Sequence, residues 1–167
     1  KECEKFEGNS LFYSIKDKSI FKDKTISIFG GGDSALDWAI ELSNTSKVNL
    51  IHRRDGFSGA ESSVQKVKEL NDQGNLNLFT KYQMDSVSGD KQIETIKIKH
   101  DEGEIKEIKS DYVLGFFGLI MQLCPILDWG LNINKKTIEV NTENFETNIR
   151  GIFAIGDICS YPGKLKL

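Results

Sequence analysis

The pattern of apolar and polar residues divides the first half of the chain into alternating strand-like and helix-like segments. Compact apolar runs occupy 25–29, 47–51 and 76–80, the length expected of buried strands. Between them, apolar residues recur at helical spacing over about 33–44 and about 60–73. Strands that alternate with helices predict βαβ units, and therefore a parallel sheet with helices packed on it.

Between residues 82 and 110 the pattern changes to short stretches in which apolar and polar residues alternate. Turn residues at 89–90 and 101–103 separate three such stretches, which lie at 84–88, 92–100 and 104–109. Turn residues between alternating stretches are typical of hairpins. We therefore expect a three-stranded antiparallel β-meander that lies against the parallel sheet.

The later apolar runs complete the predicted fold. Residues 112–117 are expected to return as a buried strand, and further strands are predicted near 137–140 and at 151–155. The predicted class is α/β: a Rossmann-like parallel sheet with helices, and the inserted meander as the third layer of a ββα arrangement.

A glycine turn follows the first apolar run. Gly30, Gly32 and Ala35 fit the dinucleotide-binding pattern G-x-G-x-x-A, in which the first glycine makes a tight turn and the second lets the backbone approach a pyrophosphate. The small third residue lets the helix pack on the strand, and the helix N-terminus offers unpaired N–H groups to phosphate. The candidate phosphate-binding residues are Gly30, Gly31, Gly32, Asp33, Ser34 and Ala35.

The next strand, about twenty residues on, ends in His52, Arg53 and Arg54. A carboxylate at this place would bind the ribose 2′-hydroxyl of NAD, whereas two arginines suit a 2′-phosphate. The three residues therefore predict an NADP(H) site. The alternative is an ordinary turn at the start of a helix with a solvated arginine pair.

Composition excludes several other functions. Hydrophobic residues make up 38% of the chain and charged residues 28%, the values of a globular protein, and the net charge of −3 argues against binding to nucleic acid or a membrane surface. The longest apolar run, 113–121, is too short to span a membrane. Cys3, Cys124 and Cys159 form no C-x-x-C pair, which favours free thiols, a cytoplasmic location and no metal site.

These features together resemble the NADPH domain of the low-molecular-weight thioredoxin reductases, from about Phe6 to the end of the chain. Residues 147–157 are similar to the segment with which these flavoproteins close their FAD site. The resemblance implies that Asp157 binds the ribityl part of FAD. An apolar strand that ends in a Gly-Asp turn is the plainer alternative for this segment.

Within that superfamily the chain most resembles the thioredoxin-reductase-like (type 2) ferredoxin–NADP⁺ reductases. The segment that carries the C-x-x-C of thioredoxin reductases is here 12–17, which contains no cysteine, and dithiol chemistry needs two. The shared residues are Tyr13 with Lys16-Asp17, and the stretches 33–38, 129–131 and 161–164. Two positions depart from the family: Ser58-Gly59 stand where a further arginine is usual, and Cys124 where glycine is common.

The resemblance implies an NADP-dependent FAD oxidoreductase that moves a hydride from NADPH to FAD and single electrons to ferredoxin or flavodoxin. The chain begins at Lys1, so we expect an excised piece: 1–22 connecting from an FAD domain, 23–146 binding NADP(H), and 147–167 returning to the FAD domain. Alone it is expected to bind NADP(H) without turnover. Two alternatives stay open: the same domain of a thioredoxin reductase, or of a relative without the disulfide that has another acceptor, and a non-enzymatic NADP-sensing module. A homodimer is possible as well.

Overall fold

A computed structural model describes residues 3–118 and 122–164 of the chain. The chain divides into two compact units, Lys1–Gly118 and Leu119–Leu167, and each is described by itself.

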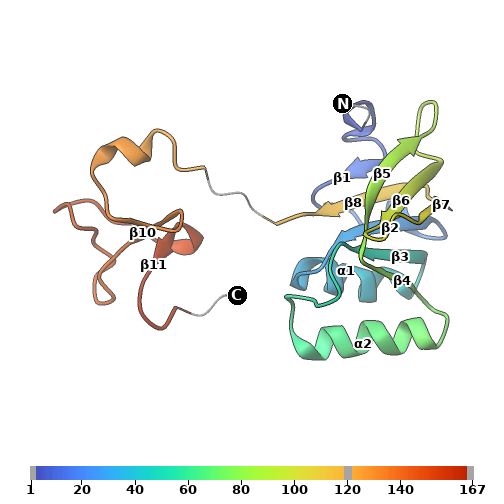
Figure 1. The fold of residues 1–167 in the computed structure, drawn as a ribbon, viewed down its shortest axis with the longest axis horizontal. Coiled ribbons are helices and arrows are strands. Elements are labelled where there is room, and N and C mark those ends of the chain that lie inside the picture. Colours follow the sequence, from blue (N-terminus) through green and yellow to red (C-terminus); the bar gives the residue numbers. More distant parts are fainter. Residues whose placement is uncertain (1–2, 119–121, 165–167) are drawn as a thin grey trace. The chain divides into compact units, whose positions relative to one another are not determined.

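Unit 1 is built on a five-stranded sheet in the order β1-β8-β2-β3-β4, and every neighbouring pair is parallel (Figure 1). The predicted parallel sheet is therefore confirmed. Its strands are β1 (Leu11–Phe12), β2 (Thr25–Gly30), β3 (Lys47–His52), β4 (Asn77–Thr80) and β8 (Tyr112–Phe116).

Two helices cover one face of this sheet, α1 (Asp33–Ser43) and α2 (Glu61–Asp72). Their apolar stripes form one core with the sheet, because Leu36 and Leu42 of α1 and Val67 of α2 are buried with Ile28 and Leu50 of the strands. The helical spacing read from the sequence thus marks the side chains that pack on the sheet.

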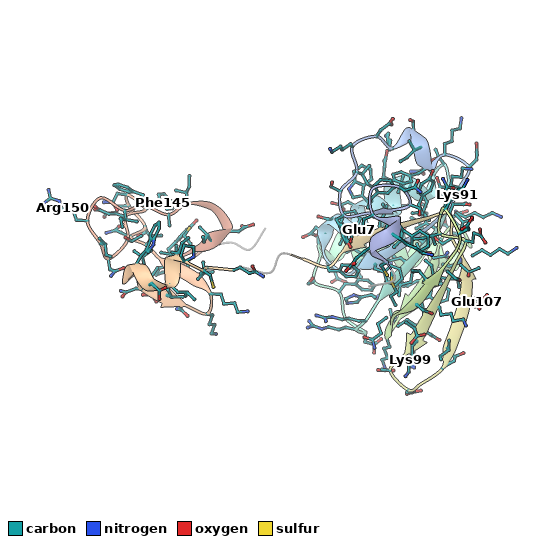
Figure 2. The ribbon with its side chains drawn as sticks, turned by 90° about the horizontal axis from the view of Figure 1, so that it is seen from above. Glu7, Lys91, Lys99, Glu107, Phe145 and Arg150 are labelled. Carbon is teal, nitrogen blue, oxygen red and sulfur yellow. The ribbon has the colours of Figure 1, made fainter. Side chains whose placement is uncertain are left out.

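The meander covers the opposite face. Its strands are β5 (Tyr82–Ser88), β6 (Thr95–His100) and β7 (Ile105–Lys109), paired antiparallel in the order β5-β6-β7. Ile96 and Ile98 are buried in a second core with Phe29, Ile51 and Val113 of the parallel sheet. Several outward residues are charged, among them Lys99 and Glu107 (Figure 2). The predicted three layers are confirmed.

The segment 3–22 also packs into unit 1. Phe6, in the 3₁₀ turn Glu4–Phe6, is buried, and so is Phe21, in the turn Ser19–Phe21. The predicted connecting segment 1–22 thus supplies the edge strand β1, which pairs with β8. The division by contacts falls after Gly118, whereas the boundaries after 22 and 146 concern a longer protein and stay a prediction.

Unit 2 holds a small three-stranded sheet in the order β11-β10-β9. The strands are β9 (Ile133–Asn134), β10 (Thr137–Glu139) and β11 (Cys159–Ser160), and 3₁₀ turns lie at Ile126–Trp129 and Gly156–Ile158. The strand expected near 137–140 is confirmed as β10. The strand expected at 151–155 is wrong, because Phe153 makes one isolated bridge to Glu146 and Ala154 alone of this run is buried.

Candidate functional site

The candidate site lies at the carboxyl edge of the parallel sheet, where β2 and β8 end side by side with Gly30 opposite Phe116. From β2 the chain passes through α1 to β3 on one side, while β8 and β1 lie on the other side. Ligands of open α/β sheets bind outside the carboxyl ends of the strands at such a reversal of strand order.

The three glycines of the turn differ in the space that surrounds them. A Cβ atom at Gly30 would lie 2.7 Å from Cβ of Ala35 and 2.8 Å from the carbonyl oxygen of Phe116, so only glycine fits between helix and sheet. A Cβ at Gly31 would overlap the imidazole ring of His52. At Gly32 the nearest atom would be Oγ of Ser58 at 3.6 Å, so this position is open to a ligand.

The N-terminus of α1 follows directly. Gly32 is its N-cap residue, in extended conformation and with no side-chain cap. Among the described residues, none accepts a hydrogen bond from the backbone N–H of Asp33 or Ser34. Ala35 is buried against the sheet, whereas Ser34 is exposed. The open turn and these N–H groups make a cradle suited to a phosphate.

The loop from 53 to 60 forms hydrogen bonds to the residues on either side of Gly32 in the sequence. Oδ1 of Asp33 accepts the backbone N–H of Ala60 at 2.7 Å, and the carbonyl oxygen of Gly31 accepts the backbone N–H of Ser58 at 2.8 Å and its hydroxyl at 3.2 Å. The carboxylate of Asp33 therefore holds the start of α2 against the glycine turn. Ser58 connects the loop to the glycine turn through these hydrogen bonds. The sequence showed Ser58 only as a departure from the family, and no sequence motif predicts this contact.

His52 supports the turn from the strand side. Its ring stacks on Phe57, with 4.9 Å between centroids and 24° between planes, and its Nε2 lies 3.0 Å from the carbonyl oxygen of Gly56. With Gly31 against the same ring, His52 holds the loop and the glycine turn together.

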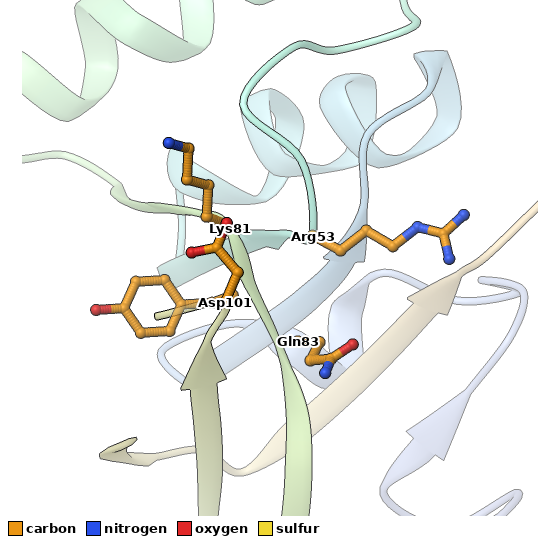
Figure 3. Close-up of a pocket in the computed structure, with 5 residues that line it drawn as sticks. Arg53, Lys81, Gln83 and Asp101 are labelled. Atoms are coloured by element: carbon orange, nitrogen blue, oxygen red, sulfur yellow. The ribbon is translucent and has the colours of Figure 1, made fainter. Parts of the chain in front are cut away.

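Arg53 and Arg54 follow β3, and both are exposed. Within the described parts of the chain, neither guanidinium forms an ion pair. Arg53 lines a pocket of about 80 Å³ with residues of the meander. Figure 3 shows its side chain pointing away from Lys81 and Asp101. Both arginines can therefore meet an anion without first breaking an ion pair.

Asp157 lies in unit 2, in the short turn Gly156–Ile158, and is exposed. Gly156 has a φ of +81°, a conformation that favours glycine. Nζ of Lys164 donates to the carbonyl oxygens of Gly156 at 2.9 Å and Cys159 at 2.7 Å, which fixes this turn. The sequence marked Lys164 as part of a motif but not as the residue that holds the Gly-Asp turn.

One other cluster of polar groups lies at the turn between β6 and β7. The ligand atoms of His100, Asp101 and Glu102 lie within 4.8 Å of one another. Nδ1 of His100 accepts the backbone N–H of Glu102 at 3.2 Å, and both carboxylates are exposed. These contacts are those of a hairpin turn, and we assign no metal to them.

Comparison with known proteins shows the family of this chain. Residues 7–166 match the model of a protein family described as pyridine nucleotide-disulphide oxidoreductase. The chain belongs to this family. A relative from Pelagibacter ubique (strain HTCC1062), named ferredoxin–NADP reductase, is 71% identical over the whole of this chain and 49% of its own length. The chain spans about half the length of the curated relatives it matches.

The fold of this chain is similar to solved structures of thioredoxin reductases. A thioredoxin reductase from Lactococcus lactis matches 95% of this chain and 52% of its own, with a TM-score of 0.81 and 26% identity. A thioredoxin reductase from T. acidophilum gives a TM-score of 0.80 and 29% identity over the same shares of the two chains. The family resemblance read from the motifs is therefore confirmed. In residues 3–118 and 122–164, no helix is long and apolar enough to cross a membrane.

Proposed function

We propose that this chain is the NADP(H)-binding part of a ferredoxin–NADP⁺ reductase that contains FAD. The observation that carries the proposal is the grouping of anion-binding features at the carboxyl ends of β2 and β3. There the turn at Gly32 is open, the N–H groups of Asp33 and Ser34 have no partner among the described residues, and Arg53 and Arg54 are exposed. The names of the relatives support the same activity.

The residues divide the work of binding NADP(H). The pyrophosphate would lie on the N–H groups at Gly32 and the start of α1, where the helix dipole favours negative charge. The 2′-phosphate would meet Arg53 and Arg54, whose guanidinium groups match phosphate oxygens. Gly30, Gly31, Ala35, His52 and the carboxylate of Asp33 would act indirectly, because they hold the turn and the loop 53–60 in place, while the backbone N–H of Asp33 would face the pyrophosphate.

For FAD, the described residues offer the exposed carboxylate of Asp157 in a turn fixed by Lys164. An acceptor held in this way fits the hydroxyl groups of a ribityl chain. When bound, FAD would exchange a hydride with the nicotinamide and single electrons with ferredoxin or flavodoxin. We propose that this chain alone binds NADP(H) without turnover.

A thioredoxin reductase is the second candidate, favoured by the solved structures that match the fold. Against it, all three cysteines are free. Cys159 is buried, with its thiol 3.1 Å from the carbonyl oxygen of Gly156, and Cys3 lies 3.9 Å from the sulfur of Met84. A dithiol relay would therefore need cysteines from outside this chain. A non-enzymatic NADP sensor is the third candidate.

The deciding experiment uses the longer protein with NADPH and offers ferredoxin, flavodoxin and thioredoxin separately. Reduction of ferredoxin or flavodoxin, little affected by thiol alkylation, supports the proposal. Inhibition by a thiol reagent only after reduction by NADPH would indicate a dithiol and move the protein to the thioredoxin reductases. No reduction of any acceptor, with NADP⁺ still bound, would favour the sensor.

Two further hypotheses concern the setting. The free cysteines favour a reducing compartment, and we propose the cytoplasm, to be tested by fractionation of the source cells. A homodimer is tested by light scattering of the longer protein.

A further inference from the structure

Two exposed aromatic rings lie near Gly115, at the carboxyl end of β8. Tyr13 follows β1 and is 53% exposed, and Phe117 follows β8 and is 66% exposed. Both rings lie against Gly115, since a Cβ there would be 2.6 Å from Cε2 of Phe117 and 3.2 Å from Cδ1 of Tyr13. The absence of a side chain at Gly115 thus lets both rings lie close to the backbone of β8.

Contacts on both sides hold this pair in place. The hydroxyl of Tyr13 donates a hydrogen bond to Oε1 of Glu7 at 2.8 Å, and this bond raises the pKa of Tyr13. The Phe117 ring lies 6.5 Å from the ring of Phe29, a buried residue of β2 that pairs with Gly115. Rings that are each held by a neighbouring side chain and remain more than half exposed are suited to stack on a planar ligand.

The order of the strands points to the ligand. The sheet runs β1-β8-β2-β3-β4, so β3 with its arginines lies on one side of the glycine turn, and β8 and β1 lie on the other. A dinucleotide with its pyrophosphate at Gly32 and its 2′-phosphate beyond β3 must extend its other half across the ends of β8 and β1. That half ends in nicotinamide, a planar ring that is cationic when oxidised and is attracted to aromatic faces.

We propose that Tyr13 and Phe117 form a stacking surface for the nicotinamide half of NADP(H). The inference rests on the proposed NADP(H) site and adds to it the residues that bind the reacting end of the cofactor. Because the rings touch only that half, they set the affinity for the complete dinucleotide and not the affinity for its phosphorylated adenosine half.

The test compares two ligands by calorimetric titration of the 167-residue chain. NADP⁺ carries nicotinamide, whereas adenosine 2′,5′-bisphosphate carries the 2′-phosphate without it. Phe117→Ala and Tyr13→Ala should each weaken NADP⁺ by about fivefold or more, the effect of losing one aromatic stacking partner, and leave the bisphosphate affinity unchanged. Phe117→Tyr, which keeps the ring, should bind NADP⁺ as the parent chain does.

Ile105→Ala is the matched control, because Ile105 is an exposed apolar residue of β7 on the meander. It should change neither affinity, and circular dichroism should be native for every variant. An unchanged ratio of NADP⁺ to bisphosphate affinity in both aromatic variants would refute the stacking surface and leave the phosphate site standing. A parent chain that binds neither ligand would instead overturn the NADP(H) site itself.

Discussion

Removal of the two arginines after β3 is the most direct test of the NADP(H) site. The variants are Arg53→Ala, Arg54→Ala and the double change. The 2′-phosphate is the only group that distinguishes NADP⁺ from NAD⁺, so the change should appear in the ratio of the two affinities. Affinity for NAD⁺ should stay close to that of the parent chain.

The magnitude follows from the exposure of these side chains. A hydrogen bond to a charged group contributes about 1.5–3 kcal/mol, and exposure places Arg53 and Arg54 near the lower end of that range. Since about 1.4 kcal/mol corresponds to a tenfold change in affinity, each single change should lower the preference for NADP⁺ by about tenfold. The double variant should have no preference left.

Calorimetric titration with NADP⁺ and NAD⁺ measures this ratio, first at low and then at high salt. The preference should shrink as salt is added, because exposed charges are screened. Lys47→Ala is the matched control: it removes the same charge from the other end of β3, about 20 Å away along the strand. Arg53 and Arg54 do not bind the 2′-phosphate if the parent chain binds both cofactors equally, or if Lys47→Ala lowers the ratio as much as the arginine changes do.

Three further predictions test the remaining residues. Gly32→Val should abolish NADP⁺ binding in calorimetry, because the new side chain occupies the open turn. Its circular dichroism spectrum should stay native, since the extended backbone accepts valine and the nearest described atom belongs to Ser58. Gly30→Ala should instead lower the melting temperature, because its Cβ would meet Ala35 and Phe116. Asp33→Ala should reduce the free energy of unfolding by about 1 kcal/mol and weaken NADP⁺, since the loop loses its bond to Ala60; unchanged binding would contradict this role. Asp157→Ala should lower the FAD content of the purified longer protein and leave NADP⁺ affinity in this chain unaltered, and a loss of NADP⁺ binding would mean that Asp157 is misassigned.

The sequence predicted the layers of unit 1 because each layer has its own local period. Leu36 and Ala39 recur at helical spacing, and Ile96 and Ile98 alternate along a strand. Both patterns record which side of an element is buried, so they carry over directly to the fold. The packing role of Gly30 was also predictable, because the tight contact of strand and helix at Ala35 follows from the motif itself.

The roles of the loop residues could not be predicted in this way. Ser58 bonds to Gly31, 27 positions earlier, and Asp33 bonds to Ala60, 27 positions later. These hydrogen bonds exist only once the helix and the loop have been brought together by the sheet, and hydroxyl and carboxylate groups in turns have many other partners open to them. Residue type and spacing therefore predicted which segments form the candidate site. Which of their residues would bind the ligand and which hold the others in position depended on tertiary contacts.

The failed strand at 151–155 has a different physical cause. A strand signal from an apolar run records side chains that are suited to burial, but a strand also needs a neighbour that completes its backbone hydrogen bonds. Here Phe153 is 58% and Ile155 is 74% exposed, and within the described residues the only ladder contact is the bridge from Phe153 to Glu146. The same segment leads into Gly156 and Asp157, whose turn is set by Lys164 and not by strand pairing. The Gly-Asp turn keeps its shape without the strand, and the predicted role of Asp157 therefore does not depend on that strand.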